Sequence, residues 1–232
     1  MKKIIFPIFF LLFAKLGYAQ ANFGARMGMN LGTIELKNDN ITTGEDYLIS
    51  QSLSILINMD IDVPFSTVFS FRTGLGLVIK GSEIDYIPTL SQQYPDTNWS
   101  LLYRMNYLEV PLFLVARAET DFYGKFFFGV GPTLSLGVGG RMTLFADAKN
   151  GGQRDISYDL VWGNKPVPED ARHGYNYLKR FDLGLGAIFA YQLPKSGLTF
   201  TAGYNKGLRN ISPVEGINLK TSYFSAGIGF SM

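Results

Sequence analysis

The residues best suited to chemistry in this sequence are its single histidine and the carboxylates near it. His173 lies close in the chain to Asp170 and Arg172. A hydrolytic site needs a base, an orienting partner and a nucleophile that meet at one point. No nucleophile stands at a spacing that would bring it to His173. We therefore interpret the histidine as a solvated loop residue and predict no enzyme.

Metal and cofactor sites are not predicted either. The chain has 0 Cys, and one histidine with scattered carboxylates lacks the spacing of metal ligands. Gly-x-Gly pairs begin at Gly74, Gly129 and Gly184. Each pair lies within a strand-like segment and none opens a helix, as a nucleotide-binding motif would. These glycines are expected to line a crowded interior.

A second set of charged residues occurs inside the apolar, strand-like segments. Its members are Arg26, Arg72, Glu109, Arg117 and Asp182. Charged side chains in a confined interior have to be paired. The sequence therefore predicts a polar network that includes Arg72, Glu109 and Arg117. Its simplest role is a plug that fixes strand register, and the alternative is a proton or ion path.

The segments that carry these charges alternate with a period of two. Phe200, Tyr204, Ile228 and Phe230 fall on one phase, and glycine or small polar residues fill the other. Successive strand side chains point to opposite faces, so this period indicates β-strands. The second face is nearly uncharged. The apolar face is therefore expected to meet lipid, with the glycine-rich face lining a tight barrel.

Eight strand segments are predicted, and their connections alternate between short and long. The segments are residues 22–36, 48–60, 67–80, 101–118, 123–139, 178–192, 197–208 and 220–232. An even strand number with alternating short turns and long loops is typical of outer-membrane barrels. The sequence thus predicts an all-β fold, an eight-stranded antiparallel transmembrane β-barrel of the outer-membrane type.

A barrel of eight strands has an interior that side chains just fill, so a wide water pore is not expected. The main structural alternative is a soluble lipocalin-like barrel, which also has eight alternating strands. In that fold the apolar face would point inward to a ligand. The two interpretations differ in whether Phe200, Tyr204, Ile228 and Phe230 face outward or inward.

The amino terminus predicts export. Lys2 and Lys3 precede an apolar run that ends in small residues before Ala19, which is the pattern of a secretory signal peptide. The predicted division is a signal peptide over residues 1–19 and a barrel domain over residues 20–232. Loss of Lys2, Lys3 and Lys15 would change the formal charge from +2 to −1, so no nucleic acid partner is implied. The expected location is the outer membrane of a Gram-negative cell, with membrane lipid as a partner.

Several motifs resemble those of the PorT-like outer-membrane β-barrel family of Bacteroidetes. They are Asn106-Tyr-Leu-Glu-Val-Pro-Leu-Phe-Leu114, Phe128-Gly-Val-Gly-Pro132, Phe181-Asp-Leu-Gly-Leu-Gly186 and residues 202–211. The opening residues 23–31 look like the first strand of that family. The resemblance covers the mature chain and implies an eight-stranded barrel in the outer membrane. The family takes its name from a component linked to type IX secretion and gliding.

The expected function is that of a structural or interaction protein. Loops on a rigid scaffold are where binding sites usually lie, so the extracellular loops are the expected working surface, with other envelope proteins as partners. The alternatives are an accessory subunit of an export or uptake assembly and a narrow channel. No cofactor is expected in any of these roles.

Overall fold

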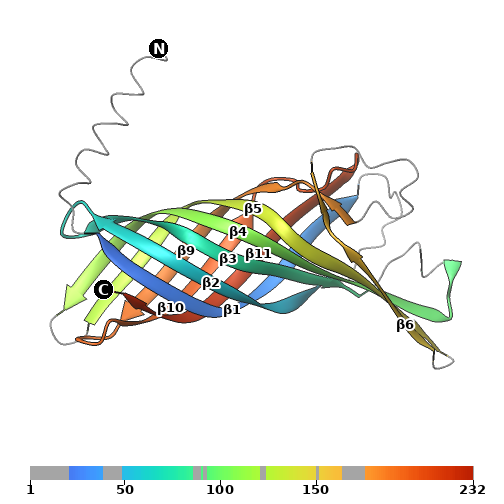
Figure 1. The fold of residues 1–232 in the computed structure, drawn as a ribbon, viewed down its shortest axis with the longest axis horizontal. Helices are drawn as coiled ribbons and strands as arrows, with labels where there is room; N and C mark the ends of the chain where they lie inside the picture. Colours follow the sequence, from blue (N-terminus) through green and yellow to red (C-terminus); the bar gives the residue numbers. More distant parts are fainter. Residues whose placement is uncertain are drawn as a thin grey trace, which may run out of the picture.

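The protein is described by a computed structural model over residues 21–38, 49–85, 90, 93–120, 124–149, 152–163 and 176–231. Most of these residues lie in long antiparallel strands (Figure 1). The barrel strands are β1 (Asn22–Asn38), β2 (Ile49–Pro64), β3 (Phe69–Ile84), β4 (Thr97–Thr120), β5 (Gly124–Ala148), β9 (Phe181–Gln192), β10 (Leu198–Gly207) and β11 (Ile217–Ser231). The predicted signal peptide and His173 lie outside the described residues.

The eight long strands close into a ring. The hydrogen-bonded order runs from β4 through β3, β2, β1, β11, β10 and β9 to β5, and β5 returns to β4. β1 and β11 complete the ring, from Gly24 opposite Ser231 to Asn38 opposite Ile217. The eight-stranded antiparallel barrel predicted from the alternation is therefore confirmed. No helix among the described residues has the length and hydropathy of a membrane-spanning helix.

The two ends of the barrel differ. The first residue of β1 and the last of β11 lie at the same end, together with the short connections after β2 and β9 (Figure 1). We call this the terminal end. The opposite, distal end carries a further strand, β6 (Gln153–Asp159), and two short parallel strands, β7 (Val161–Trp162) and β8 (Tyr177–Leu178). Long connections occur only at the distal end, as the sequence predicted.

The orientation of the alternating faces is that of a membrane barrel. Phe200, Tyr204, Ile228 and Phe230 are 46%, 37%, 43% and 49% exposed. A soluble lipocalin would bury these residues around a ligand, so the lipocalin alternative is wrong. The exterior of every barrel strand carries partly or fully exposed apolar side chains between the two ends. This band is the surface that a bilayer core would cover.

The distal half of the interior is an apolar plug. Its buried members include Tyr103, Met105 and Tyr107 from β4 with Leu178 and Ile211 from the distal connections. Trp162 of β7 packs edge to face on Tyr107, with 5.2 Å between ring centroids. The distal connections therefore fold back into the barrel and fill it.

A one-residue bulge re-phases β5 where this plug begins. Tyr107 is opposite Gly137, whereas Asn106 is opposite Gly139, so Val138 is the extra residue. Gly140 follows with φ of 146°, a conformation that side chains disfavour. Odd-numbered residues of β5 face the interior before the bulge. Because of the extra residue, even-numbered residues do so beyond it, and Met142 faces the plug.

β5 and β6 differ most from the sequence-based expectation. Residues 140–177 were predicted to be a loop, yet β5 continues to Ala148 and pairs with both β4 and β6 beyond the barrel rim. Both faces of this projecting sheet are accessible, and residues 153–157 are all exposed. A strand without a buried face needs no apolar alternation, so its sequence gave no strand signal.

Candidate functional site in the barrel lumen

The middle of the lumen holds a buried cluster of three ionisable side chains. Lys80 of β3 lies 3.1 Å from Asp182 of β9 and 3.5 Å from Glu109 of β4, measured from Nζ to the nearest carboxylate oxygen. The three side chains are between 1% and 7% exposed. We call Lys80, Glu109 and Asp182 the central cluster. It links strands that lie on different sides of the barrel.

Neutral side chains add hydrogen bonds to the central cluster. Ser135 Oγ donates to Glu109 Oε2 at 2.9 Å, and the Tyr223 hydroxyl donates to Oε1 at 2.5 Å. Thr221 Oγ1 donates to Asp182 Oδ2 at 3.0 Å. The Lys80 ammonium also lies 4.5 Å from the centroid of the Tyr107 ring. A buried charge is tolerated when its partners replace water in this way.

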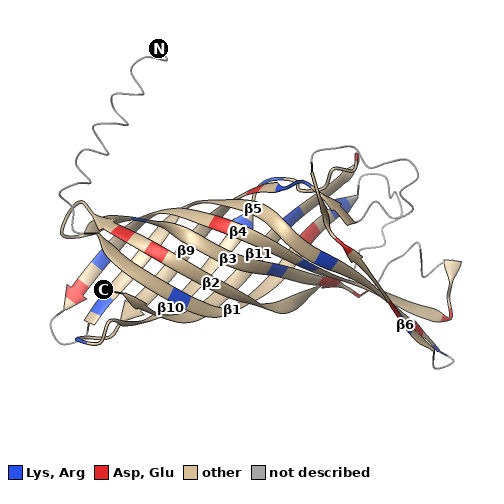
Figure 2. Cartoon of the chain, in the orientation of Figure 1, with Lys and Arg blue, Asp and Glu red and all other residues tan. Residues whose placement is uncertain are grey.

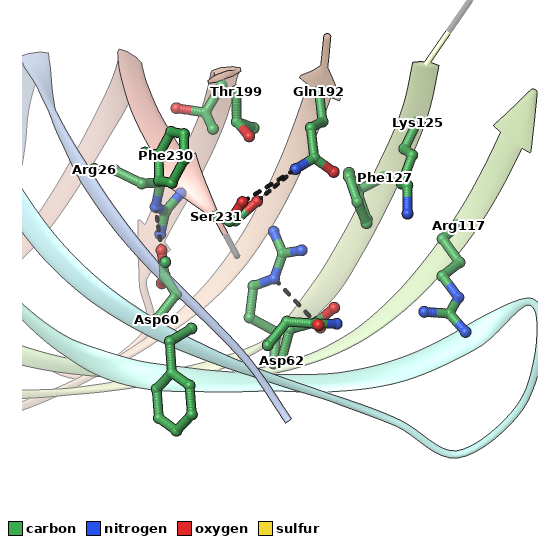
Figure 3. Close-up of a pocket in the computed structure, with 15 residues that line it drawn as sticks. Arg26, Asp60, Asp62, Arg117, Lys125, Phe127, Gln192, Thr199, Phe230 and Ser231 are labelled. Carbon is green, nitrogen blue, oxygen red and sulfur yellow. Dashed lines mark hydrogen bonds and ion pairs between the residues drawn. The ribbon is translucent and has the colours of Figure 1, made fainter. Parts of the chain in front are cut away.

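A second layer of ion pairs lies nearer the terminal end. Arg26 Nε is 2.6 Å from Asp60 Oδ2, and Arg72 Nε is 3.5 Å from Asp62 Oδ1 (Figure 3). Ser70 Oγ donates to the same Asp62 oxygen at 2.8 Å. Both pairs join neighbouring strands, β1 to β2 and β2 to β3. This layer fixes the register of three consecutive strands.

The opposite wall of this layer is apolar. Phe113, Val115, Phe127, Ile188 and Ala190 form a buried cluster on β4, β5 and β9. The guanidinium carbon of Arg72 lies 5.0 Å from the centroid of the Phe127 ring, so the arginine bridges the polar and apolar walls. At this level the interior therefore has a charged side, formed by β1, β2 and β3, and an apolar side, formed by β4, β5 and β9.

The five charged residues predicted to share a lumen network are distributed over different levels. Glu109 and Asp182 meet in the central cluster, while Arg26 and Arg72 form separate pairs nearer the terminal end. The expected association of Arg72 with Glu109 is wrong. Glu109 is opposite Gly76, and Arg72 is four residues further along β3. Lys80 is four residues from Gly76 in the other direction, and its long side chain extends to Glu109, whereas that of Arg72 pairs with Asp62 on β2.

Arg117 does not join the network either. Its guanidinium donates from Nε to the Thr67 carbonyl at 3.0 Å and from Nη2 to the Ser66 carbonyl at 2.9 Å. Both acceptors belong to the short connection between β2 and β3. Arg117 therefore secures a turn at the terminal end, because β4 has reached the rim at this position.

Sequence reasoning missed the partners of these charges. Lys80 was placed at the last position of its predicted strand, yet β3 continues to Ile84. Asp60 and Asp62 lie on the inward phase of β2 but were not included. The alternation of the sequence contained this information, because strand residues separated by an even number of positions share a face. Lys80 therefore shares the face of Arg72, and Asp60 and Asp62 share the face of Asn58.

Small cavities enter the lumen from the terminal end and stop below the central cluster. The first has a volume of about 120 Å³ and is lined by Arg26, Asp62, Arg72 and Gln192 among others (Figure 3). The second, of about 40 Å³, is lined by Arg26, Glu109 and Tyr223 among others. Arg26 lines both. Space for a few waters thus reaches Glu109, beyond which Lys80 and the apolar plug fill the barrel.

The described part of the lumen holds no group of three side chains suited to bind a metal ion. Its residues are paired with one another, in two layers, through charge and hydrogen bonds. This arrangement can hold strand register and block passage.

Comparison with known proteins agrees with the fold. The family described as "Outer membrane protein beta-barrel domain" matches residues 18–212. No curated protein matches the sequence. The chain is similar in structure to OprG from Pseudomonas aeruginosa (13% identity, TM-score 0.45, 94% of this chain and 98% of that chain). It is also similar to Ail of Yersinia pestis (9% identity, TM-score 0.41, 91% of this chain and 99% of that chain). With most of its length matched, the chain belongs to the outer membrane protein beta-barrel domain family.

Proposed function

We propose that this protein is a non-conducting, non-enzymatic outer-membrane barrel that acts as an interaction protein through its distal surface. The observation that carries the proposal is the contrast between the two parts of the molecule. The lumen is filled by the central cluster and the apolar plug, whereas β4, β5 and β6 project beyond the rim. In barrels of this kind both chain ends lie in the periplasm, so the distal end faces the exterior.

The filled lumen argues against a channel. Ions that crossed it would have to displace Lys80 from two carboxylates and then separate the packed rings of Tyr107 and Trp162. Reconstitution of the purified protein in planar bilayers is expected to give no unitary current steps. Steady unitary steps would show a conducting path and overturn the non-conducting barrel.

The projecting sheet supports an interaction role. β6 pairs with β5 from Asp159 opposite Arg141 to Gln153 opposite Asp147 and has no second neighbour among the described strands. A strand with one open edge can pair with an extended segment of another protein. Ile156, near the middle of β6, is 45% exposed and offers an apolar contact beside that edge.

Mild-detergent pull-down from cells tests the interaction role. We expect a stoichiometric envelope protein to co-purify with the wild type and to be lost with Ile156→Asp. Val68→Asp is the matched control, because Val68 is 48% exposed at the terminal end. Absence of any stoichiometric partner, or equal loss in both variants, would overturn the interaction role.

The resemblance to PorT-like barrels of Bacteroidetes supports a narrower proposal, an accessory role in an export or uptake assembly. The motif of residues 106–114 lies on β4, and those of residues 128–132 and 181–186 lie on the neighbouring strands β5 and β9. If the co-purifying protein is a component of such an assembly, and loss of this barrel reduces its cargo outside the cell, the narrower role holds. A partner unrelated to transport would reject it.

We also propose that residues 1–19 are removed during export. The support is the pattern of Lys2 and Lys3 before an apolar run that ends near Ala19. Mass spectrometry of the protein recovered from the membrane is expected to find Gln20 as the first residue. A mature chain that retains Lys2 would contradict cleavage.

A further inference from the structure

Basic residues gather on the outer surface of the barrel near its distal end. Figure 2 shows basic positions on neighbouring strands toward the end from which β6 projects. Five of them lie on or directly beside the consecutive strands β4, β5, β9, β10 and β11, and we call them the basic arc. The basic arc consists of Arg104, Arg141, Lys206, Arg209 and Lys220.

Arg104 and Arg141 are the most unusual pair in the basic arc. They are directly opposite each other on β4 and β5, and both are exposed. Like charges in directly opposed positions destabilise a sheet unless an anion lies between them. Asp159 is 3.7 Å from Arg141, on the side away from β4, and no described carboxylate pairs with Arg104. The pair therefore offers two guanidinium groups to one external anion.

The remaining members continue the arc around the barrel. Lys206 is opposite Ser222, two residues from Lys220, on β10 and β11. The guanidinium of Arg209 lies 5.3 Å from the centroid of the Phe181 ring, at the distal start of β9. Neither Lys206 nor Lys220 forms an ion pair with a described carboxylate. Acidic residues lie beside two members of the arc, with Glu35 opposite Lys220 on β1 and Asp159 opposite Arg141 on β6.

Lys206 and Arg141 each follow exposed apolar or aromatic side chains of the barrel exterior. Lys206 follows Tyr204 on the outward phase of β10, and the Tyr204 ring lies tilted against that of Phe224 with 4.5 Å between centroids. On β5, Val138 is 48% exposed just before Arg141. Apolar side chains thus give way to aromatic rings and then to cations within one or two outward positions. Aromatic belts mark the level of the headgroups.

We propose that the basic arc binds the phosphate groups of an anionic glycolipid in the outer leaflet of the membrane. Guanidinium groups bind phosphate oxygens in a bidentate manner, and a phosphate between Arg104 and Arg141 removes their mutual repulsion. Lys206, Arg209 and Lys220 provide further cations on and beside β10 and β11 for neighbouring headgroups. The lipid is preferred over a soluble anion because Arg141 lies at the base of the projecting sheet, three residues after the exposed Val138 of the apolar band.

The amount of phosphorylated glycolipid that stays with the purified protein tests this proposal. The full chain is purified in mild detergent as wild type, as Arg104→Gln/Arg141→Gln, and as the control Lys149→Gln/Arg154→Gln. The control removes two cations from the projecting β5–β6 hairpin, beyond the apolar band. Bound lipid per protein is measured by mass spectrometry. A cation near a membrane surface contributes about a fivefold change in binding, so a loss of at least about fivefold is expected in the first variant.

Equal lipid retention in the two double variants would overturn the proposal. The temperature-dependent gel mobility of folded barrels verifies folding, and Lys206→Gln/Lys220→Gln replaces the arginine variant if that one does not fold. A soluble source is tested with inorganic phosphate and a sulfated oligosaccharide on delipidated protein. If either binds through Arg104 and Arg141 and co-purified lipid does not depend on them, the arc serves soluble anions and the lipid assignment is wrong.

Discussion

Lys80 and Asp182 are 102 residues apart in the chain, yet Nζ of the lysine lies 3.1 Å from Oδ2 of the aspartate in the middle of the barrel. The two residues belong to β3 and β9, which are separated around the ring by β4 and β5. Their contact therefore joins opposite parts of the wall. It depends on closure of the barrel and contributes to holding it closed.

Lys80→Met is expected to destabilise the barrel strongly. The change leaves Glu109 and Asp182 buried without a cation, and removal of one partner from a buried ion pair costs about 3–5 kcal/mol. Urea unfolding of the protein in lipid vesicles, followed by gel mobility, measures the free energy of unfolding. Lys125→Met is the control, because Lys125 pairs with Glu119 at the surface and its loss should cost less than about 1 kcal/mol. Equal stability of the two variants would contradict the role of the central cluster.

Gly137→Val is expected to expel Trp162 from the apolar plug. A Cβ atom at Gly137 would lie 2.3 Å from Cε3 and Cζ3 of the Trp162 ring. Overpacking of this kind costs about 1–3 kcal/mol or displaces the ring toward water. In a Trp99→Phe background, tryptophan fluorescence should shift to longer wavelength. Gly139→Ala, whose Cβ would meet only Asn106 Nδ2 at 3.7 Å, should leave the spectrum unchanged.

Ile228→Lys is expected to impair membrane insertion. Ile228 is 43% exposed in the apolar band, and a lysine at the bilayer midplane costs about 2–4 kcal/mol in a membrane barrel. Val68→Lys is the matched control, because Val68 is 48% exposed in the short connection between β2 and β3, at the terminal edge of the band, where the cost is about 0–1 kcal/mol. The folded fraction in lipid vesicles measures both. A variant Ile228→Lys that is folded and soluble without detergent would refute the outward orientation.

Arg26 and Asp60 are expected to be energetically coupled. A double-mutant cycle of Arg26→Gln and Asp60→Asn should give an interaction energy of about 1–3 kcal/mol, because both side chains are about nine-tenths buried and 2.6 Å apart. The same cycle on Glu119 and Lys125, which are 2.8 Å apart at the surface, should give less than about 1 kcal/mol. Similar coupling in both cycles would mean that burial does not strengthen the lumen pair.

The alternation of residue types allowed the fold and the inward face to be predicted. Arg26, Arg72 and Asp182 stand on the glycine-rich phase of their strands, Glu109 stands on the inward phase of β4, and all four are largely buried within the barrel. Side-chain direction in a strand is a local property with a period of two, so it can be read from neighbours in the chain. The same local rule placed Ile228 and Phe230 on the outer surface.

The pairing of the charges required the tertiary structure. Arg72 and Lys80 are each four residues from Gly76, the residue opposite Glu109, yet Lys80 extends to Glu109 while Arg72 pairs with Asp62. Which cation meets which carboxylate therefore depends on how the long side chains pack inside the closed barrel. The projecting β6 was also missed, since a strand exposed on both faces carries no apolar pattern. The sequence alone thus determined which way each strand faces. Barrel closure and register, which depend on contacts between distant segments, decided which residues meet inside it.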